Sequence, residues 1–217
     1  MLQRRYVWEW PVRLTHWFIV LSIIALSVTG IYIGNPNLSV PKTSSFVMGW
    51  MRAVHFGFAY LFAVSFVVRL LWMFFGNKYA RWTAFIPWAS KEGWRNIIGT
   101  FSWYTFLRRK VPYVVGHNAL AGIAYSFVFV LFTLQIVSGF ALYGQYDPNG
   151  LWASVTAPFL SLFSNQGLRL THHMIMWLLI GFAIHHVYSG WLMDVKEKNG
   201  TLGSIFGGYK FIDPKDL

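Results

Sequence analysis

Residues 170–193 have the sequence LTHHMIMWLLIGFAIHHVYSGWLM, an apolar stretch that carries two adjacent pairs of histidines. About 20 residues of helix, rising roughly 1.5 Å each, cover the hydrocarbon of a bilayer, so this stretch is long enough to span one. An imidazole in hydrocarbon is costly and is retained there for a purpose. The stretch therefore predicts a membrane helix built around functional histidines.

His172 and His186 are the one pair of these histidines that lines a single helical face. They are 14 residues apart. At about 100° per residue this separation brings them within roughly 40° of each other, about 21 Å apart along the helix. The other combinations lie about 120–140° apart. Helical geometry therefore selects His172 and His186, and leaves His173 and His185 with hydrogen bonding to neighbouring groups.

The composition places the chain among polytopic membrane proteins. Of its 217 residues, 56% are hydrophobic and only 12% are charged, which is too little charge for the surface of a soluble domain. The sequence predicts an all-α integral membrane protein, a four-transmembrane-helix bundle forming a single domain over residues 1–217. We expect its spans at about 14–34, 53–75, 117–144 and 170–193.

The chain contains no cysteine. This excludes a thiolate-ligated iron–sulfur cluster, a covalently attached c-type haem and a disulfide within the chain. The basic N-terminus precedes an apolar run that is too long for the core of a signal peptide. No small-residue cleavage site follows that run, so we expect the first span to be a retained anchor.

The net charge of +11 is arranged as a topology signal. Fourteen Lys and Arg residues fall in the two termini and between the second and third spans, against three (Lys42, Arg52, Arg169) on the other side. The positive-inside rule therefore places both termini in the cytoplasm. The basic charge then faces anionic lipid, and nucleic acid is not expected as a partner.

Two segments outside the spans are unusually apolar. An apolar stripe at about 91–107 predicts a helix lying in the membrane interface, and a loop anchored by tryptophans is the alternative. The segment 147–167, DPNGLWASVTAPFLSLFSNQG, is mildly apolar for an exposed loop. It is either a docking surface or an ordinary connection.

The predicted topology matches four histidines in depth. His55 and His172 begin their spans near the outer face, whereas His16 and His186 lie toward the cytoplasm. A single histidine near a helix end more often snorkels or forms hydrogen bonds, but two depth-matched pairs favour metal ligation. Two imidazoles suit the axial positions of a haem iron and leave no open position, so the chemistry is electron transfer. The sequence therefore predicts two stacked b haems, an outer one held by His55/His172 and an inner one by His16/His186.

Three further residues are candidates for the same chemistry. His117 begins the third span on the cytoplasmic side, where it competes with His16 for the inner iron or serves proton or quinone chemistry. Arg13 and Arg69 are candidates for pairing with haem propionates, although snorkelling explains Arg69 equally well.

The chain resembles the b-type cytochrome subunits of membrane-bound nickel–iron hydrogenases, within the bacterial cytochrome b561-like group. The resemblance runs over nearly the whole length and is carried by YVWE (6–9), PVR (11–13), HW (16–17), TGIYIGNP (29–36), VHF (54–56), GNKYAR (76–81), GHN (116–118), SGFALY (138–143), MW (176–177), HVY (186–188) and GY (208–209). The TGIYIGNP and GNKY stretches point to the hydrogenase branch.

The resemblance implies a location, partners and site residues. It implies an electron-transfer subunit of the bacterial inner membrane that is not an enzyme by itself. It implies the hydrogenase small and large subunits as partners on the outer side and membrane quinone as electron acceptor. The family's haem ligands match His16, His55, His172 and His186. The family's GHN motif makes His117 and Asn118 the quinone candidates.

The sequence leaves two other kinds of function open. The same scaffold can serve a formate dehydrogenase, a thiosulfate reductase or a stand-alone b561 oxidoreductase. A haem-free transporter lined by histidines is the alternative from another class. His185 stands where a glycine is expected in relatives, which leaves the choice between His185 and His186 for the inner iron to be tested.

Overall fold

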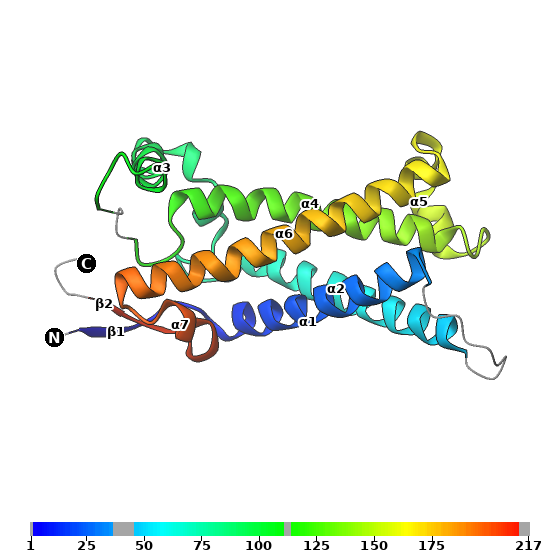
Figure 1. Ribbon diagram of the computed structural model, residues 1–217, viewed down its shortest axis with the longest axis horizontal. Helices are drawn as coiled ribbons and strands as arrows, with labels where there is room; N and C mark the ends of the chain where they lie inside the picture. The colour runs from blue at the N-terminus through cyan, green and yellow to red at the C-terminus, as the bar shows by residue number, and fades with distance from the viewer. Residues whose placement is uncertain (1, 37–45, 111–113, 213–217) are drawn as a thin grey trace. The chain divides into compact units, whose positions relative to one another are not determined.

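The computed structural model describes residues 2–36, 46–110 and 114–212, and most of these residues are helical (Figure 1). Four helices are long and apolar enough to cross a membrane. They are α1 (Trp10–Gly34), α2 (Val47–Phe75), α4 (Ala119–Gly144) and α6 (Asn165–Glu197). These four helices correspond to the four predicted spans, so the predicted fold class is confirmed.

The helices extend beyond the predicted spans at several ends. Helix α2 begins at Val47 and helix α6 at Asn165, several residues before the predicted starts. The prediction counted only the apolar core of each span. Polar residues such as Asn165 and Gln166 continue the helix because its backbone hydrogen bonds do not require apolar side chains.

The remaining elements are short. They are α3 (Lys91–Tyr104), α5 (Leu151–Leu162), α7 (Thr201–Gly207), the 3-10 helices η1 (Trp82–Phe85) and η2 (Pro87–Ala89), and the strands β1 (Gln3–Tyr6) and β2 (Tyr209–Ile212). Helix α3 lies where the amphipathic helix was predicted, and its N-cap Ser90 accepts a hydrogen bond from the Gly93 amide. The sequence did not predict α5, α7 or the strands.

The chain forms two compact units, and the boundary between them falls inside each of the four long helices. Unit 1 comprises residues 1–14, 68–130 and 183–217, and unit 2 comprises residues 15–67 and 131–182.

Unit 1 joins the two ends of the chain. Strands β1 and β2 pair antiparallel, with Gln3 opposite Ile212 and Tyr6 opposite Tyr209 (Figure 1). The amides of Val7 and Trp8 both donate to the Gly208 carbonyl, at 2.8 and 3.1 Å.

Glu9 and Asn77 tie the N-terminal segment to the end of α2. The Glu9 carboxylate accepts from the Trp72 indole at 2.9 Å and from the Asn77 amide at 2.8 Å. The Asn77 side chain donates to the Val7 carbonyl, and its oxygen accepts from the amides of two following residues. This network gives a role to two polar residues at the ends of the spans, Glu9 just before α1 and Asn77 just after α2.

Unit 2 packs the apolar faces of its helices around aromatic rings. Phe132 of α4 contacts Phe62 and Phe66 of α2 edge to face, with ring centroids 5.0 and 5.5 Å apart. Trp152 of α5 donates to the Tyr60 hydroxyl at 2.7 Å. Helix α5 is therefore held against α2 within this unit.

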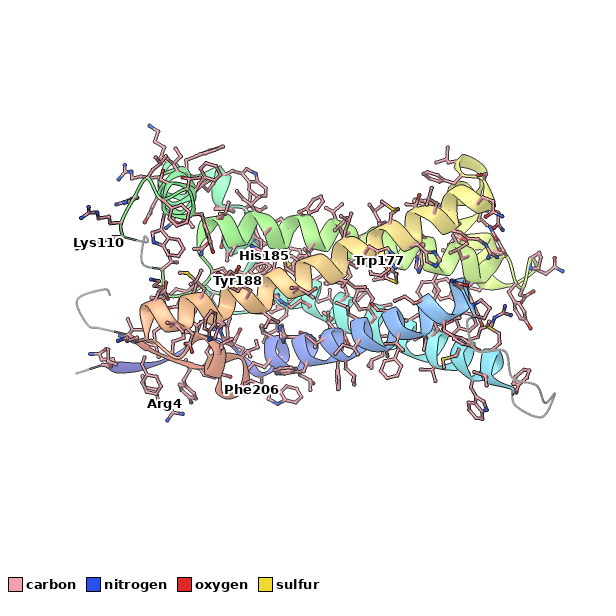
Figure 2. All side chains as sticks on the ribbon, viewed as in Figure 1. Arg4, Lys110, Trp177, His185, Tyr188 and Phe206 are labelled. Carbon is pink, nitrogen blue, oxygen red and sulfur yellow. The ribbon has the colours of Figure 1, made fainter. Side chains whose placement is uncertain are left out.

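The long helices expose most of their apolar surface. Only 17 to 22% of the residues in their most apolar windows are buried. Trp177 and Tyr188 project from α6 in Figure 2, and both side chains are more than half exposed. Such surface is suited to lipid rather than to water.

We predict that Gly208→Ala destabilises unit 1. Gly208 has a φ of 85°, and an added Cβ would lie 2.6 Å from the Tyr6 ring and 2.8 Å from the Trp8 carbonyl oxygen. The left-handed backbone alone costs about 1–2 kcal/mol for a residue with a Cβ, and the contacts add to it. Thermal unfolding in detergent should show a lower midpoint.

Gly203→Ala is the matched control, because an added Cβ at Gly203 meets nothing within 4 Å. Alanine also favours a helix interior over glycine, so this variant should unfold at or above the temperature of the parent protein. Equal midpoints for the two variants would contradict the role given to Gly208.

Candidate functional site

Unit 2 contains a cavity of about 910 Å³ into which both His55 and His172 face. Its volume lies near the upper end of the range of roughly 300–1,000 Å³ that is typical of cofactor sites. Most of the lining is aliphatic or aromatic, contributed by α1, α2, α4 and α6. The structure therefore brings the predicted outer pair of histidines to one cavity.

His55 of α2 is half-buried and fixed from α1. Its Nδ1 lies 2.8 Å from the Thr29 hydroxyl oxygen. Gly30, the next residue of α1, allows this approach, because a Cβ there would lie 3.2 Å from His55 Cε1.

His172 of α6 is held in the same manner from α4. Its Nδ1 lies 2.9 Å from the Ser138 hydroxyl oxygen, and its Nε2 lies 3.2 Å from the Gln135 amide nitrogen. A Cβ on Gly139 would lie 3.1 Å from His172 Cε1. Each predicted outer ligand therefore meets a hydroxyl and a glycine that are adjacent in sequence.

His173 and two arginines also line the cavity of unit 2. The His173 Nδ1 lies 2.8 Å from the Arg169 carbonyl oxygen one turn earlier, so this ring is committed to its own helix. A Cβ on Gly34 would lie 2.7 Å from His173 Nε2. The side chains of Arg52 and Arg169 lie at the same cavity.

The second histidine pair of α6 lies in unit 1, and its two members differ in environment. His186 is half-buried, and its Nδ1 lies 3.3 Å from the Tyr125 hydroxyl of α4. His185 is exposed, and its Nδ1 lies 3.4 Å from the Ser189 hydroxyl one turn later. His185 and Tyr188 are seen on α6 in Figure 2.

His117 lies in unit 1 among aromatic rings. Its ring centroid is 4.7 Å from those of Trp8 and Tyr125 and 5.7 Å from that of Phe85. The imidazole is half-buried at the N-terminal end of α4.

Asn118 and Asn96 cap helix α4. The Asn118 side-chain oxygen accepts from the Ala121 amide at 2.8 Å, and the Asn96 oxygen accepts from the Ala119 amide at 3.0 Å. Both bonds satisfy amides that a helix N-terminus leaves without an intrahelical partner. The bond from Ala119 to Asn96 also joins α4 to α3, because Asn96 belongs to α3.

His16 lies in unit 2 and His186 lies in unit 1. The His16 ring meets Trp17 edge to face at 5.3 Å.

The two candidate arginines for propionates differ in their surroundings within unit 1. Arg13 donates to the Phe206 carbonyl, and among the described residues its buried Nε has no hydrogen-bond partner. Arg69 is buried and lies over the Phe85 ring at 5.1 Å, with the Ala80 carbonyl 3.5 Å away.

The sequence did not predict that four residues contact the histidines: Thr29, Ser138, Gln135 and Tyr125. All four are uncharged polar residues inside apolar helices, which is a signal that the sequence does contain. Their partners lie on other helices, so helical spacing does not reveal what they contact.

Membrane-length helices that hold pairs of half-buried imidazoles at a large apolar cavity are typical of membrane cytochromes of the b type. A comparison with known proteins gives a narrower assignment. The chain belongs to the prokaryotic cytochrome b561 family, whose model matches residues 7–208.

The similar proteins carry names of one kind. A probable Ni/Fe-hydrogenase B-type cytochrome subunit from Cupriavidus necator is 35% identical over 214 residues, covering 96% of this chain and 88% of that protein. A protein of the same name from Bradyrhizobium diazoefficiens is 36% identical, covering 94% and 84%. The probable Ni/Fe-hydrogenase 1 B-type cytochrome subunit of Escherichia coli is 32% identical, covering 94% and 90%.

These matches confirm the resemblance inferred from the sequence, and they confirm haem b as the cofactor. The number of haems and the residues that hold them stay predictions. The chain is a membrane cytochrome and therefore an electron-transfer component.

We predict that Gly139→Leu lowers the haem content of the purified protein. The bulky side chain must displace the His172 ring, because even a Cβ would lie 3.1 Å from it. Gly57→Leu is the control, since Gly57 is exposed and its added Cβ meets nothing within 4 Å. The pyridine haemochrome assay measures the haem per protein, and equal values for the two variants would count against the close approach.

Proposed function

We propose that this chain is the di-haem cytochrome b subunit that anchors a periplasmic nickel–iron hydrogenase and passes its electrons to membrane quinone. The observation that carries the proposal is the cavity of unit 2, which two half-buried imidazoles from different helices face. The names of the relatives support the hydrogenase as electron donor. Lipid surrounds the exposed apolar faces of the four long helices.

The residues at this cavity fit a haem. The lining is largely apolar, the two imidazoles come from α2 and α6, and glycines of α1 and α4 make room beside each ring. Haem b bound between two imidazoles supplies a one-electron couple with no open coordination position. His55 and His172 would hold it and exclude other ligands from the iron.

Arg52 and Arg169 suit the two propionates of this haem. Both line the cavity, and no carboxylate among the described residues pairs with either of them. They are also two of the three basic residues on the side that the positive-inside rule leaves nearly free of positive charge. A propionate partner explains why cations are placed there.

His16 and His186 would hold the second haem. Two observations favour His186 over His185: the ring is less exposed, and a tyrosine of the neighbouring helix contacts its Nδ1. Arg13 would bind a propionate of this haem, because its buried Nε lacks a partner among the described residues. Such a buried donor is costly unless a ligand satisfies it.

The charge distribution supports the orientation of the chain. Of the sixteen Lys and Arg residues that the structure describes, fourteen belong to unit 1 and two to unit 2. Both termini therefore lie in the cytoplasm. With this orientation, the start of α6, which carries His172, would lie near the periplasmic surface, where a hydrogenase of that compartment would dock.

His117 and Asn118 would form the quinone site. His117 is a titratable ring among aromatic side chains, an environment that suits a quinone ring and the protons that accompany its reduction. The Asn118 oxygen is used in capping α4, so its amide N–H groups are the part that would bind a quinone oxygen.

We predict which histidine substitutions remove a haem. His55→Ala and His172→Ala should each remove the same haem, and His16→Ala and His186→Ala the other. His173→Ala and His185→Ala should leave both, because His173 is committed to its own helix and His185 is exposed. The haem-to-protein ratio and the reduced-minus-oxidised spectrum give the count. Loss of a haem in His185→Ala but not in His186→Ala would reverse the assignment.

The function is tested on the purified complex of this chain with its hydrogenase subunits. Hydrogen should reduce the haem, and a quinone analogue should reoxidise it. We predict that His117→Gln leaves the reduction by hydrogen unchanged and slows reoxidation by on the order of 10²-fold, the usual contribution of a general acid or base.

His185→Gln is the matched control for His117→Gln and should not change either rate. A protein without a b-type haem spectrum would overturn the proposal and favour the transporter. Haem that hydrogen does not reduce in the intact complex would point to another donor on the same scaffold.

A further inference from the structure

The contacts of His55 and His172 follow one pattern that occurs twice in unit 2. Thr29–Gly30 on α1 faces His55, and Ser138–Gly139 on α4 faces His172. In each case the hydroxyl lies at the Nδ1 of the imidazole, and the glycine lies beside Cε1. Two separate helices therefore present the same dipeptide, hydroxyl then glycine, to the two rings of one cavity.

The hydroxyl protons in this pattern already have acceptors. Thr29 Oγ1 donates to the Ala25 carbonyl at 2.6 Å, and Ser138 Oγ donates to the Gln135 carbonyl at 3.2 Å. A hydroxyl has one proton, so its oxygen acts as an acceptor toward the imidazole. The Nδ1–H group of each histidine therefore donates to the hydroxyl, and each Nε2 carries the lone pair.

A second contact at His172 agrees with this tautomer. The Gln135 side-chain nitrogen lies 3.2 Å from His172 Nε2. With its amide nitrogen toward the ring, Gln135 donates to Nε2, which is the acceptor in the Nδ1–H tautomer. Nε2 is the nitrogen through which the imidazole would bind iron, so iron would take the place of the Gln135 contact.

We propose that Thr29 and Ser138 are positioning residues that hold His55 and His172 in the Nδ1–H tautomer and would thereby tune the reduction potential of a haem bound by these two histidines. This inference rests on the proposed ligation by His55 and His172. Each hydroxyl is buried, at 5% and 1% exposure, so water does not replace it readily. The chain His Nδ1–H to hydroxyl to helix carbonyl transmits the acceptor strength of the backbone to the ring.

The chemistry gives the direction of the effect. An acceptor at Nδ1–H raises the basicity of a ligating imidazole, and a more basic ligand stabilises ferric iron over ferrous iron. Removing the hydroxyl should therefore raise the reduction potential of the haem. The orientation of the ring should also loosen, because the hydrogen bond no longer fixes its rotation.

The test uses Thr29→Val and Ser138→Ala in the full-length protein with its haem. Redox titration should show that each variant raises the reduction potential of one haem. The expected rise is about 59 mV, which for a one-electron couple is a tenfold lower ferric-to-ferrous ratio at a fixed potential. The shifted haem should be the same in both variants, and the other haem should keep its potential. The g-values of the low-spin ferric signal should change for that haem alone.

Thr156→Val is the matched control. Thr156 is also a buried helical threonine of unit 2, 6% exposed, whose hydroxyl donates to the carbonyl four residues earlier at 2.6 Å, as Thr29 does. Its helix, α5, carries no histidine. Thr29→Ser keeps the hydroxyl and should retain the original potential.

The outcomes separate this inference from the proposed function. Unchanged potentials in both variants, with both haems present, would overturn the role of the hydroxyls and leave the ligands in place. Shifts of two different haems would overturn the pairing of His55 with His172. A parent protein without haem would overturn the proposed function itself.

Discussion

The structure of unit 2 depends on the cost of placing an imidazole nitrogen in hydrocarbon without a hydrogen-bond partner. An unpaired polar group there costs several kcal/mol, on the order of 2–7 kcal/mol depending on the reference state. His55 and His172 avoid this cost at Nδ1 through hydroxyls of adjacent helices. The hydroxyls avoid it in turn through carbonyls of their own helices. Glycine next to each hydroxyl allows the imidazole to approach closely, because an added Cβ would lie only 3.1–3.2 Å from the ring. The hydrogen bonds that satisfy these two rings therefore also join α1 to α2 and α4 to α6.

The need for hydrogen-bond partners also explains contacts in unit 1, where the groups that need partners are backbone amides. The first amides of α4 would lack partners, and the side chains of Asn118 and Asn96 supply them. The amides of Val7 and Trp8 would lack partners as the chain enters α1, and the Gly208 carbonyl accepts from both. Short polar segments far apart in the sequence are thereby joined at the ends of the spans. This joining gives a physical reason for the polar motifs that carried the family resemblance, such as GNKYAR, whose Asn77 bonds the N-terminal segment.

The sequence predicts those features that one helix contains by itself. The four spans follow from the length of the apolar runs, and the choice of His172 over His173 follows from spacing along α6. The hydroxyl partners did not follow, because Thr29 and His55 are 26 residues apart and Ser138 and His172 are 34 apart. A spacing rule within one helix contains no information about such pairs. The small sheet was missed for a similar reason: β1 and β2 are four residues each, at opposite ends of the chain. Helix α5 was expected only as an apolar segment, since its tie to α2 depends on one indole and one hydroxyl.

The arrangement of polar groups also distinguishes an electron carrier from a transporter. A transported solute must leave its site, so its ligands are expected to change partners during the cycle. Here the imidazoles of His55 and His172 are each fixed at Nδ1 by a buried hydroxyl and lie close to a glycine of the neighbouring helix, and the hydrogen bond resists rotation of the ring. Rigid ligands suit electron transfer, because little reorganisation then accompanies the change of charge on the iron. The hydroxyl–glycine dipeptides therefore have two effects. They satisfy a polar ring that is buried in apolar surroundings, and they keep the site rigid, as the proposed electron transfer requires.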